Sequence, residues 1–171
     1  MDLFEVIQKR QSVRAYQPRA LEPGKLDAIL AAVQQAPSAG NLQGYQVWVV
    51  RAEAVKKRLA RAALGQDFLA QAPVVLVFCA QADRSGKYGK RGAELYCLQD
   101  ATIAVAYAQL AATALGVATC WIGAFDEAEA ARGLELPTGL RPIAMLPIGY
   151  AAETPARTPR RALTDLVVQP V

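Results

Sequence analysis

Residues 100–126 read DATIAVAYAQLAATALGVATCWIGAFD, and the 25 residues between Asp100 and Asp126 carry no formal charge. Such a stretch is longer than a membrane span needs to be. However, polar side chains such as Gln109 interrupt it, Gly116 divides it, and it lacks flanking basic residues and an aromatic belt. We therefore expect no membrane partner, and instead a helix, apolar on nearly all sides, at the centre of a core or of a dimer interface.

The segments around this helix predict an α+β fold. The run PVVLVFC at 73–79 is typical of a strand that is buried on both faces. Apolar spacing and end signals predict helices at 2–10, 26–36, 54–63, 94–115 and 127–133, strands at 45–50, 73–79, 117–122 and 142–150, and a mobile surface loop at 83–92. Since no linker, repeat or G-x-G-x-x-G fingerprint interrupts this order, we expect one domain, 1–171, whose central mixed or antiparallel sheet is flanked by helices.

The composition narrows the classes of function. The net charge is +4 and 13 of the 19 basic residues are arginine, which suits an anionic partner, but no basic run indicates nucleic acid. The absence of histidine excludes Ser-His and Cys-His catalysis and histidine-ligated metals, and no metal site is expected. Three cysteines in apolar surroundings and an N-terminus unlike a signal peptide indicate a reduced, cytoplasmic protein.

Two arginine-rich segments, one near each end of the chain, could bind phosphate. Arg10, Ser12 and Arg14 alternate, so in extended backbone all three side chains point to one side, where they could surround a phosphate or a polarised ring carbonyl. The alternative is that Arg10 only complements the end of the first helix. In the tail, residues 157–161 (RTPRR) offer a second pair of arginine forks, unless they are simply a solvated terminus.

Two further segments could hold a flat, hydrogen-bonding ring. The loop 36–43 (APSAGNLQ) offers polar donors and acceptors beside a glycine, although an ordinary turn uses the same residue types. The strand end 119–125 (TCWIGAF) places two aromatic residues around a glycine, which is also how a plain core packs.

Taken together and in this order, the four segments resemble the nitroreductase family over nearly the whole chain. The resemblance implies an FMN-binding fold that forms an intertwined homodimer. It implies that Arg10 and Ser12 contact the phosphate and ribityl chain, that Arg14 lies near N1 and O2 of the flavin, and that Arg160 and Arg161 complete the phosphate site. It places the loop residues Pro37, Ser38, Asn41 and Gln43 at the flavin of the other subunit, and the backbone of Ile122 and Gly123 near N5.

The implied activity is that of an FMN-dependent oxidoreductase. NADH or NADPH would pass a hydride to flavin N5, and a small acceptor such as a nitroaromatic or a quinone would take the electrons, with no catalytic side chain needed. Alternatives are a specialised flavin reaction, such as dehydrogenation or dehalogenation, and a non-catalytic flavin-binding protein. The chain departs from the family pattern where Gly44-Tyr45, instead of Pro-Trp, follows Gln43. It also leaves little room after Ile122 for a cover over the site, so an open pocket is expected, with residues 83–92 as a candidate lid.

Overall fold

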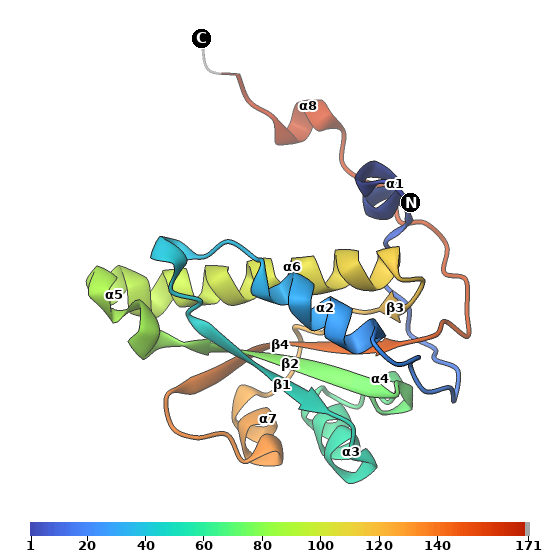
Figure 1. The fold of residues 1–171 in the computed structure, drawn as a ribbon, viewed down its shortest axis with the longest axis horizontal. Coiled ribbons are helices and arrows are strands. Elements are labelled where there is room, and N and C mark those ends of the chain that lie inside the picture. Colours follow the sequence, from blue (N-terminus) through green and yellow to red (C-terminus); the bar gives the residue numbers. More distant parts are fainter. Residues whose placement is uncertain (170–171) are drawn as a thin grey trace.

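The computed structural model describes residues 1–169, so the last two residues of the predicted domain lie outside the described part. Its centre is an antiparallel sheet with the strand order β1-β2-β4-β3. The strands are β1 (Tyr45–Val50), β2 (Val74–Gln81), β3 (Ala118–Thr119) and β4 (Leu140–Gly149). Helices cover both faces, so the predicted α+β arrangement is confirmed (Figure 1).

Strand β2 joins the two halves of the core because its side chains alternate between the faces of the sheet. Val74, Leu76 and Phe78 pack into one cluster, under α2 (Lys25–Gln34) and α6 (Cys97–Ala114). Val75, Val77 and Cys79 pack into the other, which lies against α3 (Glu53–Ala62), α4 (Phe68–Gln71) and α7 (Glu127–Leu134). The prediction that 73–79 is buried on both faces is therefore confirmed.

Helix α6 is the long helix that the sequence predicted, and Asp100 near its start is its one charged residue. Its inner side, including Ala101, Val105 and Ala108, is fully buried against the sheet. Its outer side carries exposed but uncharged side chains, among them Ala106 and Tyr107. In residues 1–169, no helix has both the length and the hydropathy of a membrane span.

Both ends of the chain leave the body on the same side. Helix α1 (Leu3–Lys9) begins with a capping box in which Asp2 accepts a hydrogen bond from the Glu5 amide and Glu5 accepts one from Asp2. The C-terminal tail runs beside α1 and contains the short helix α8 (Leu163–Leu166), which the sequence did not predict (Figure 1). Neither helix packs into the core clusters.

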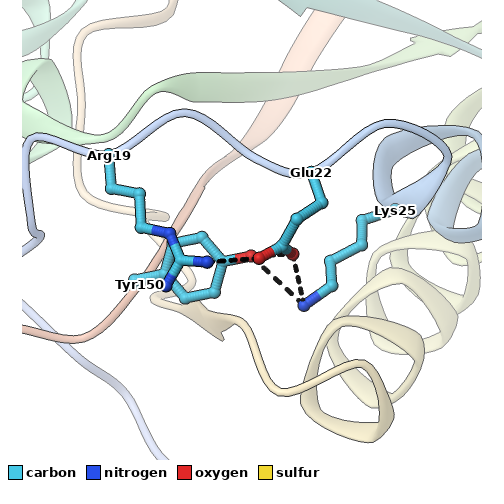
Figure 2. A network of polar contacts seen from close by, with 4 residues as sticks. All are labelled: Arg19, Glu22, Lys25 and Tyr150. Atoms are coloured by element: carbon cyan, nitrogen blue, oxygen red, sulfur yellow. Dashed lines mark hydrogen bonds and ion pairs between the residues drawn. The ribbon is translucent and has the colours of Figure 1, made fainter.

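An ion network fixes the segment before α2 to the end of β4 (Figure 2). The Glu22 carboxylate accepts hydrogen bonds from Arg19 and from the Tyr150 hydroxyl, and it pairs with Lys25 at 2.7 Å. The Arg19 guanidinium lies over the Tyr150 ring, 4.0 Å from its centroid. These contacts, led by the hydrogen bond from Lys25, lower the pKa of Glu22 to about 2.

Residues 83–92 lie mostly at the surface, as predicted, but the prediction that they form a loop was wrong. The chain forms a 3₁₀ turn at Ala82–Tyr88, then α5 (Gly89–Arg91), then a π-helical turn at Gly92–Tyr96 that leads into α6. Ser85 and Gly92 are buried, and a side chain at position 92 would collide with the Ser85 carbonyl. The close contact between Ser85 and Gly92 therefore holds this segment in place, although its charge and glycine content are typical of a loop.

The predicted strand at 117–122 is interrupted. Thr119 lies opposite Ile148 and Ile122 opposite Met145, so the register is kept. That register places Cys120 opposite Pro147, which has no N–H to donate to the ladder. The strand therefore lasts for two residues and resumes only as a single bridge at Ile122.

Candidate functional site

The two arginine-rich segments meet at one surface pocket. It has a volume of about 490 Å³ and is lined by Arg10, Ser12 and Arg14 from one end of the chain and by Arg157 and Arg160 from the other. The Arg157 side chain also donates to the Gln8 carbonyl at 2.8 Å, which ties the tail to α1. Side chains about 145 residues apart thus form one basic surface.

The backbone at residues 12–16 is held in an extended shape by contacts that the sequence did not reveal. The Val13 amide donates to the Thr119 carbonyl at 3.0 Å, and Ser12 forms a bridge with the same residue. The buried Tyr16 hydroxyl donates to the Val13 carbonyl at 2.8 Å. Val13 therefore points into the core, while Ser12 and Arg14 line the pocket.

The chemistry of the pocket suits a phosphate group. Four guanidiniums and the hydroxyls of Ser12 and Thr158 line it, and guanidinium forks match phosphate oxygens in geometry as well as in charge. Glu153 lies beside it, where its carboxylate accepts a hydrogen bond from the Arg14 amide. The residues present therefore fit the phosphate end of a nucleotide cofactor.

Cys120 is buried near the pocket arginines, in surroundings that disfavour a reactive thiolate. Burial raises the pKa of its thiol, and nearby Arg14, Ser12 and Arg10 only partly offset this effect. The thiol therefore stays protonated at neutral pH. In residues 1–169, no cluster of three or more His, Cys, Asp or Glu side chains could hold a metal ion.

The predicted pair Arg160 and Arg161 is split. Arg160 lines the pocket and donates to the Thr158 carbonyl at 3.0 Å. Arg161 is not among the lining residues, and it donates to the Asp165 carbonyl at 2.7 Å in the direction of α8. Arg157, which belongs to the same RTPRR segment, is in the pocket instead.

The loop between α2 and β1 has an unusual backbone. Gly40, Asn41 and Gln43 have positive φ angles of 55°, 57° and 46°. Ser38 stabilises this shape because its hydroxyl accepts a hydrogen bond from the Gln43 amide at 3.0 Å. Pro37 and Asn41 are exposed, so the loop presents polar groups to its surroundings.

Asp100, which the sequence analysis did not select, holds this loop in place. Its buried carboxylate accepts hydrogen bonds from the amides of Ala39 at 2.9 Å and Gly44 at 3.2 Å. A proline at position 44 would have no amide to donate, and a Cβ there would lie 2.5 Å from the Ser85 hydroxyl oxygen. Gly44, which stands where the family pattern has proline, therefore suits its contacts with Asp100 and Ser85. The sequence did contain a signal for this role, because Asp100 is a single carboxylate near the start of a helix that otherwise has no charge.

One chain does not bring all the candidate residues together. The loop lies at the start of α6, where Asp100 holds it. In Figure 1, α1 and β3 lie at the other end of α6, and the arginine pocket is on that side, because Ser12 meets Thr119 of β3 there. An 18-residue helix is about 27 Å long, at about 1.5 Å per residue. A ligand in the pocket is thus out of reach of Pro37, Ser38, Asn41 and Gln43 of the same chain.

Ile122 and Gly123 follow a few residues after the Thr119 that contacts Ser12, and they do not line the arginine pocket. The buried Ile122 exchanges two backbone hydrogen bonds with Met145, at 2.9 and 3.0 Å. Gly123 is exposed beside Trp121, whose indole nitrogen would lie 3.2 Å from a Cβ at position 123. A flat group could approach this backbone closely.

The fold and the pocket define an α+β protein with a phosphate-suited arginine site at the edge of an antiparallel sheet. The model of the nitroreductase family matches residues 7–66 and 60–150. The FMN reductase (NAD(P)H) of Bacillus subtilis (strain 168) is 33% identical over 174 residues, covering 93% of this chain and 70% of that protein. The chain belongs to the nitroreductase family, as the resemblance of its motifs indicated.

Solved structures agree with this assignment. The structure of NfrA2 from B. megaterium matches with a TM-score of 0.91 at 28% identity, covering 99% of this chain and 74% of that chain. A nitroreductase family protein from Clostridium novyi NT matches with a TM-score of 0.82 at 30% identity, covering 90% of this chain and 87% of that chain.

Proposed function

We propose that the chain is an FMN-dependent NAD(P)H oxidoreductase that works as a single-domain homodimer and passes electrons to a small acceptor such as a nitroaromatic or a quinone. The observation that carries the proposal is the arginine pocket, in which both ends of a nitroreductase-family chain converge on a surface suited to phosphate. The relative named FMN reductase (NAD(P)H) supports the choice of cofactor and electron donor.

In this proposal, Arg10, Ser12, Arg157 and Arg160 bind the FMN phosphate, and Arg161 does not. Arg14 would face the ring, where its fixed positive charge would stabilise negative charge on the reduced cofactor. When bound, FMN would supply the redox chemistry, which is hydride uptake from NADH or NADPH and electron delivery to the acceptor. Because the chain has no histidine, water or exposed groups supply the proton.

A second copy of the chain would complete the site. The loop with Pro37, Ser38, Asn41 and Gln43 is a helix length away from the pocket of its own chain, so only a partner's loop can reach that pocket. The surfaces that a partner would cover carry little charge: the outer side of α6 is uncharged, and the apolar Phe4 of α1 and Val168 of the tail are 75% and 83% exposed. Burial of such surface favours association.

The absorption spectrum of the purified protein tests the cofactor, and reduction kinetics test the activity. We expect flavin bands, bleaching by NADH or NADPH, and turnover of menadione or a nitrofuran. Bound flavin with rapid bleaching but negligible turnover of these acceptors would favour a specialised flavin reaction. No bleaching by either nucleotide would favour a non-catalytic flavin-binding protein. The cytoplasmic location expected from the sequence stays a prediction.

A further inference from the structure

Residues 84–91, here called the basic segment, carry a concentration of positive charge away from the arginine pocket. Four of its eight residues are basic: Arg84, Lys87, Lys90 and Arg91. All four are exposed. Among residues 1–169, Lys87, Arg84 and Arg91 have no carboxylate within 4.0 Å, and Lys90 pairs with Glu94 only at 3.8 Å. The segment therefore keeps cationic groups available for an anionic ligand.

The basic segment is fixed directly against the loop between α2 and β1. Arg84 donates to the Leu42 carbonyl at 3.0 Å. Gly40 lies so close that a Cβ there would collide with the Tyr88 hydroxyl and lie 2.8 Å from the Lys87 ammonium. In Figure 1 the turn after α2 lies beside α5 at the start of α6. The basic segment therefore lies beside any group that the loop contacts.

Two aromatic rings hold the cations in place. Tyr88 and Tyr96 pack edge to face, with their centroids 5.4 Å apart. The Lys87 ammonium lies 5.0 Å from the Tyr88 centroid. The Arg91 guanidinium lies 5.6 Å from the Tyr96 centroid, and it donates to the Tyr96 hydroxyl at 3.1 Å. Ordered cations lose less entropy on binding than free ones do.

We propose that the basic segment binds the phosphate groups of the nicotinamide dinucleotide and makes the enzyme prefer NADPH, which has one phosphate group more than NADH. The proposal rests on the proposed function, because only in the homodimer does the loop, and the basic segment with it, flank the partner's flavin. The four arginines of the pocket are already assigned to FMN, three of them to its phosphate and Arg14 to its ring. A dinucleotide that brings its nicotinamide to the ring leaves its own phosphates outside, beside Lys87 and Arg91.

The test compares two double variants of the FMN-loaded protein. Lys87→Gln with Arg91→Gln removes both cations, and Lys57→Gln with Arg132→Gln is the matched control. Lys57 and Arg132 are also exposed, but they belong to α3 and α7 on the opposite face of the sheet. Calorimetric titration gives the dissociation constants of NADP⁺ and NAD⁺, and steady-state kinetics give KM for the reduced forms.

In the Lys87/Arg91 variant we expect the dissociation constant of NADP⁺ to rise about tenfold or more, because charge-assisted hydrogen bonds are lost. The rise for NAD⁺ should be smaller, and FMN affinity and kcat should not change. Lys87→Arg with Arg91→Lys keeps both charges and should retain most of the NADP⁺ affinity. The control variant should bind both nucleotides as the wild type does.

Equal weakening of NADP⁺ and NAD⁺ binding, or no weakening, would overturn the proposal while leaving the oxidoreductase function intact. A protein that takes up no FMN, as read from its spectrum before the titration, would overturn the proposed function and this inference with it. Circular dichroism of the variants separates loss of binding from loss of folding.

Discussion

At the scale of single residues, the tail arginines provide a direct test of the phosphate site. Arg160 lines the pocket and its neighbour Arg161 turns away to the Asp165 carbonyl. We expect Arg10→Ala and Arg160→Ala each to raise the FMN dissociation constant about 10- to 100-fold, from the loss of charge-assisted hydrogen bonds. Arg161→Ala should leave it unchanged. Fluorescence titration of the apoprotein with FMN measures all three, and equal effects at 160 and 161 would contradict the assignment.

Asp100 is the residue on which the loop depends. Asp100→Ala leaves the amides of Ala39 and Gly44 without their partner, at a cost of about 1–3 kcal/mol for each. We expect lower stability in urea together with weaker FMN binding, because the loop is displaced.

Asp126→Ala is the control for this variant. Asp126 is the N-cap of α7, and its side chain accepts a hydrogen bond from the Glu129 amide at 2.8 Å, far from the loop. It should lose about 1 kcal/mol of stability and no FMN affinity. Unchanged FMN binding in Asp100→Ala would remove the residue from the site.

At the scale of elements, the Glu22 network links the segment before α2 to β4 in a way that depends on pH. The pKa of Glu22 is lowered from 4.5 to about 2, so folding favours its ionised form. The stabilisation is therefore present above about pH 4.5 and is lost as the pH falls towards 2.

We expect Glu22→Gln to be less stable than the wild type near neutral pH, with a difference that shrinks between pH 4.5 and pH 2. Salt should also reduce it, because the network is partly exposed. Urea unfolding of both proteins across this range gives the difference. A difference that stays constant down to pH 2 would show that Glu22 acts by packing rather than by charge.

At the scale of the whole molecule, the proposed site depends on association. Phe4 of α1 is 75% exposed in the single chain and would be covered in the dimer. Phe4→Asp would bury an unpaired carboxylate there, which costs several kcal/mol. We expect monomers at micromolar concentration and loss of bound FMN, as measured by light scattering after gel filtration and by the flavin spectrum.

Leu64 is the matched control for Phe4, because it is 74% exposed but follows α3 on the opposite face of the sheet. Leu64→Asp should remain dimeric and yellow. A monomeric wild type that still binds FMN tightly would contradict the shared site.

Local patterns predicted much of the fold because each depends only on neighbouring residues. The run at 73–79 became one of the two inner strands of the sheet, the Asp2 and Glu5 pair became a helix cap, and residues 45–50 became β1 within the same bounds. The residue types of the phosphate site were also visible, since arginine and serine at alternate positions suit that chemistry. Local patterns gave the wrong structure for 83–92. There, a buried contact between Ser85 and Gly92 holds a charged segment in helical turns, and such a contact leaves no periodic pattern in the sequence.

Sequence patterns alone were thus enough for most of the elements, for the family and for the chemical character of the candidate residues. Only the tertiary structure decided which of them share a surface. It joined Arg10 to Arg157 and Arg160 but not to Arg161, and it separated the loop at residue 38 from that pocket by the length of α6. Contacts between residues some 145 positions apart form only when the whole core is packed, and the spacing of neighbouring residues does not predict that packing.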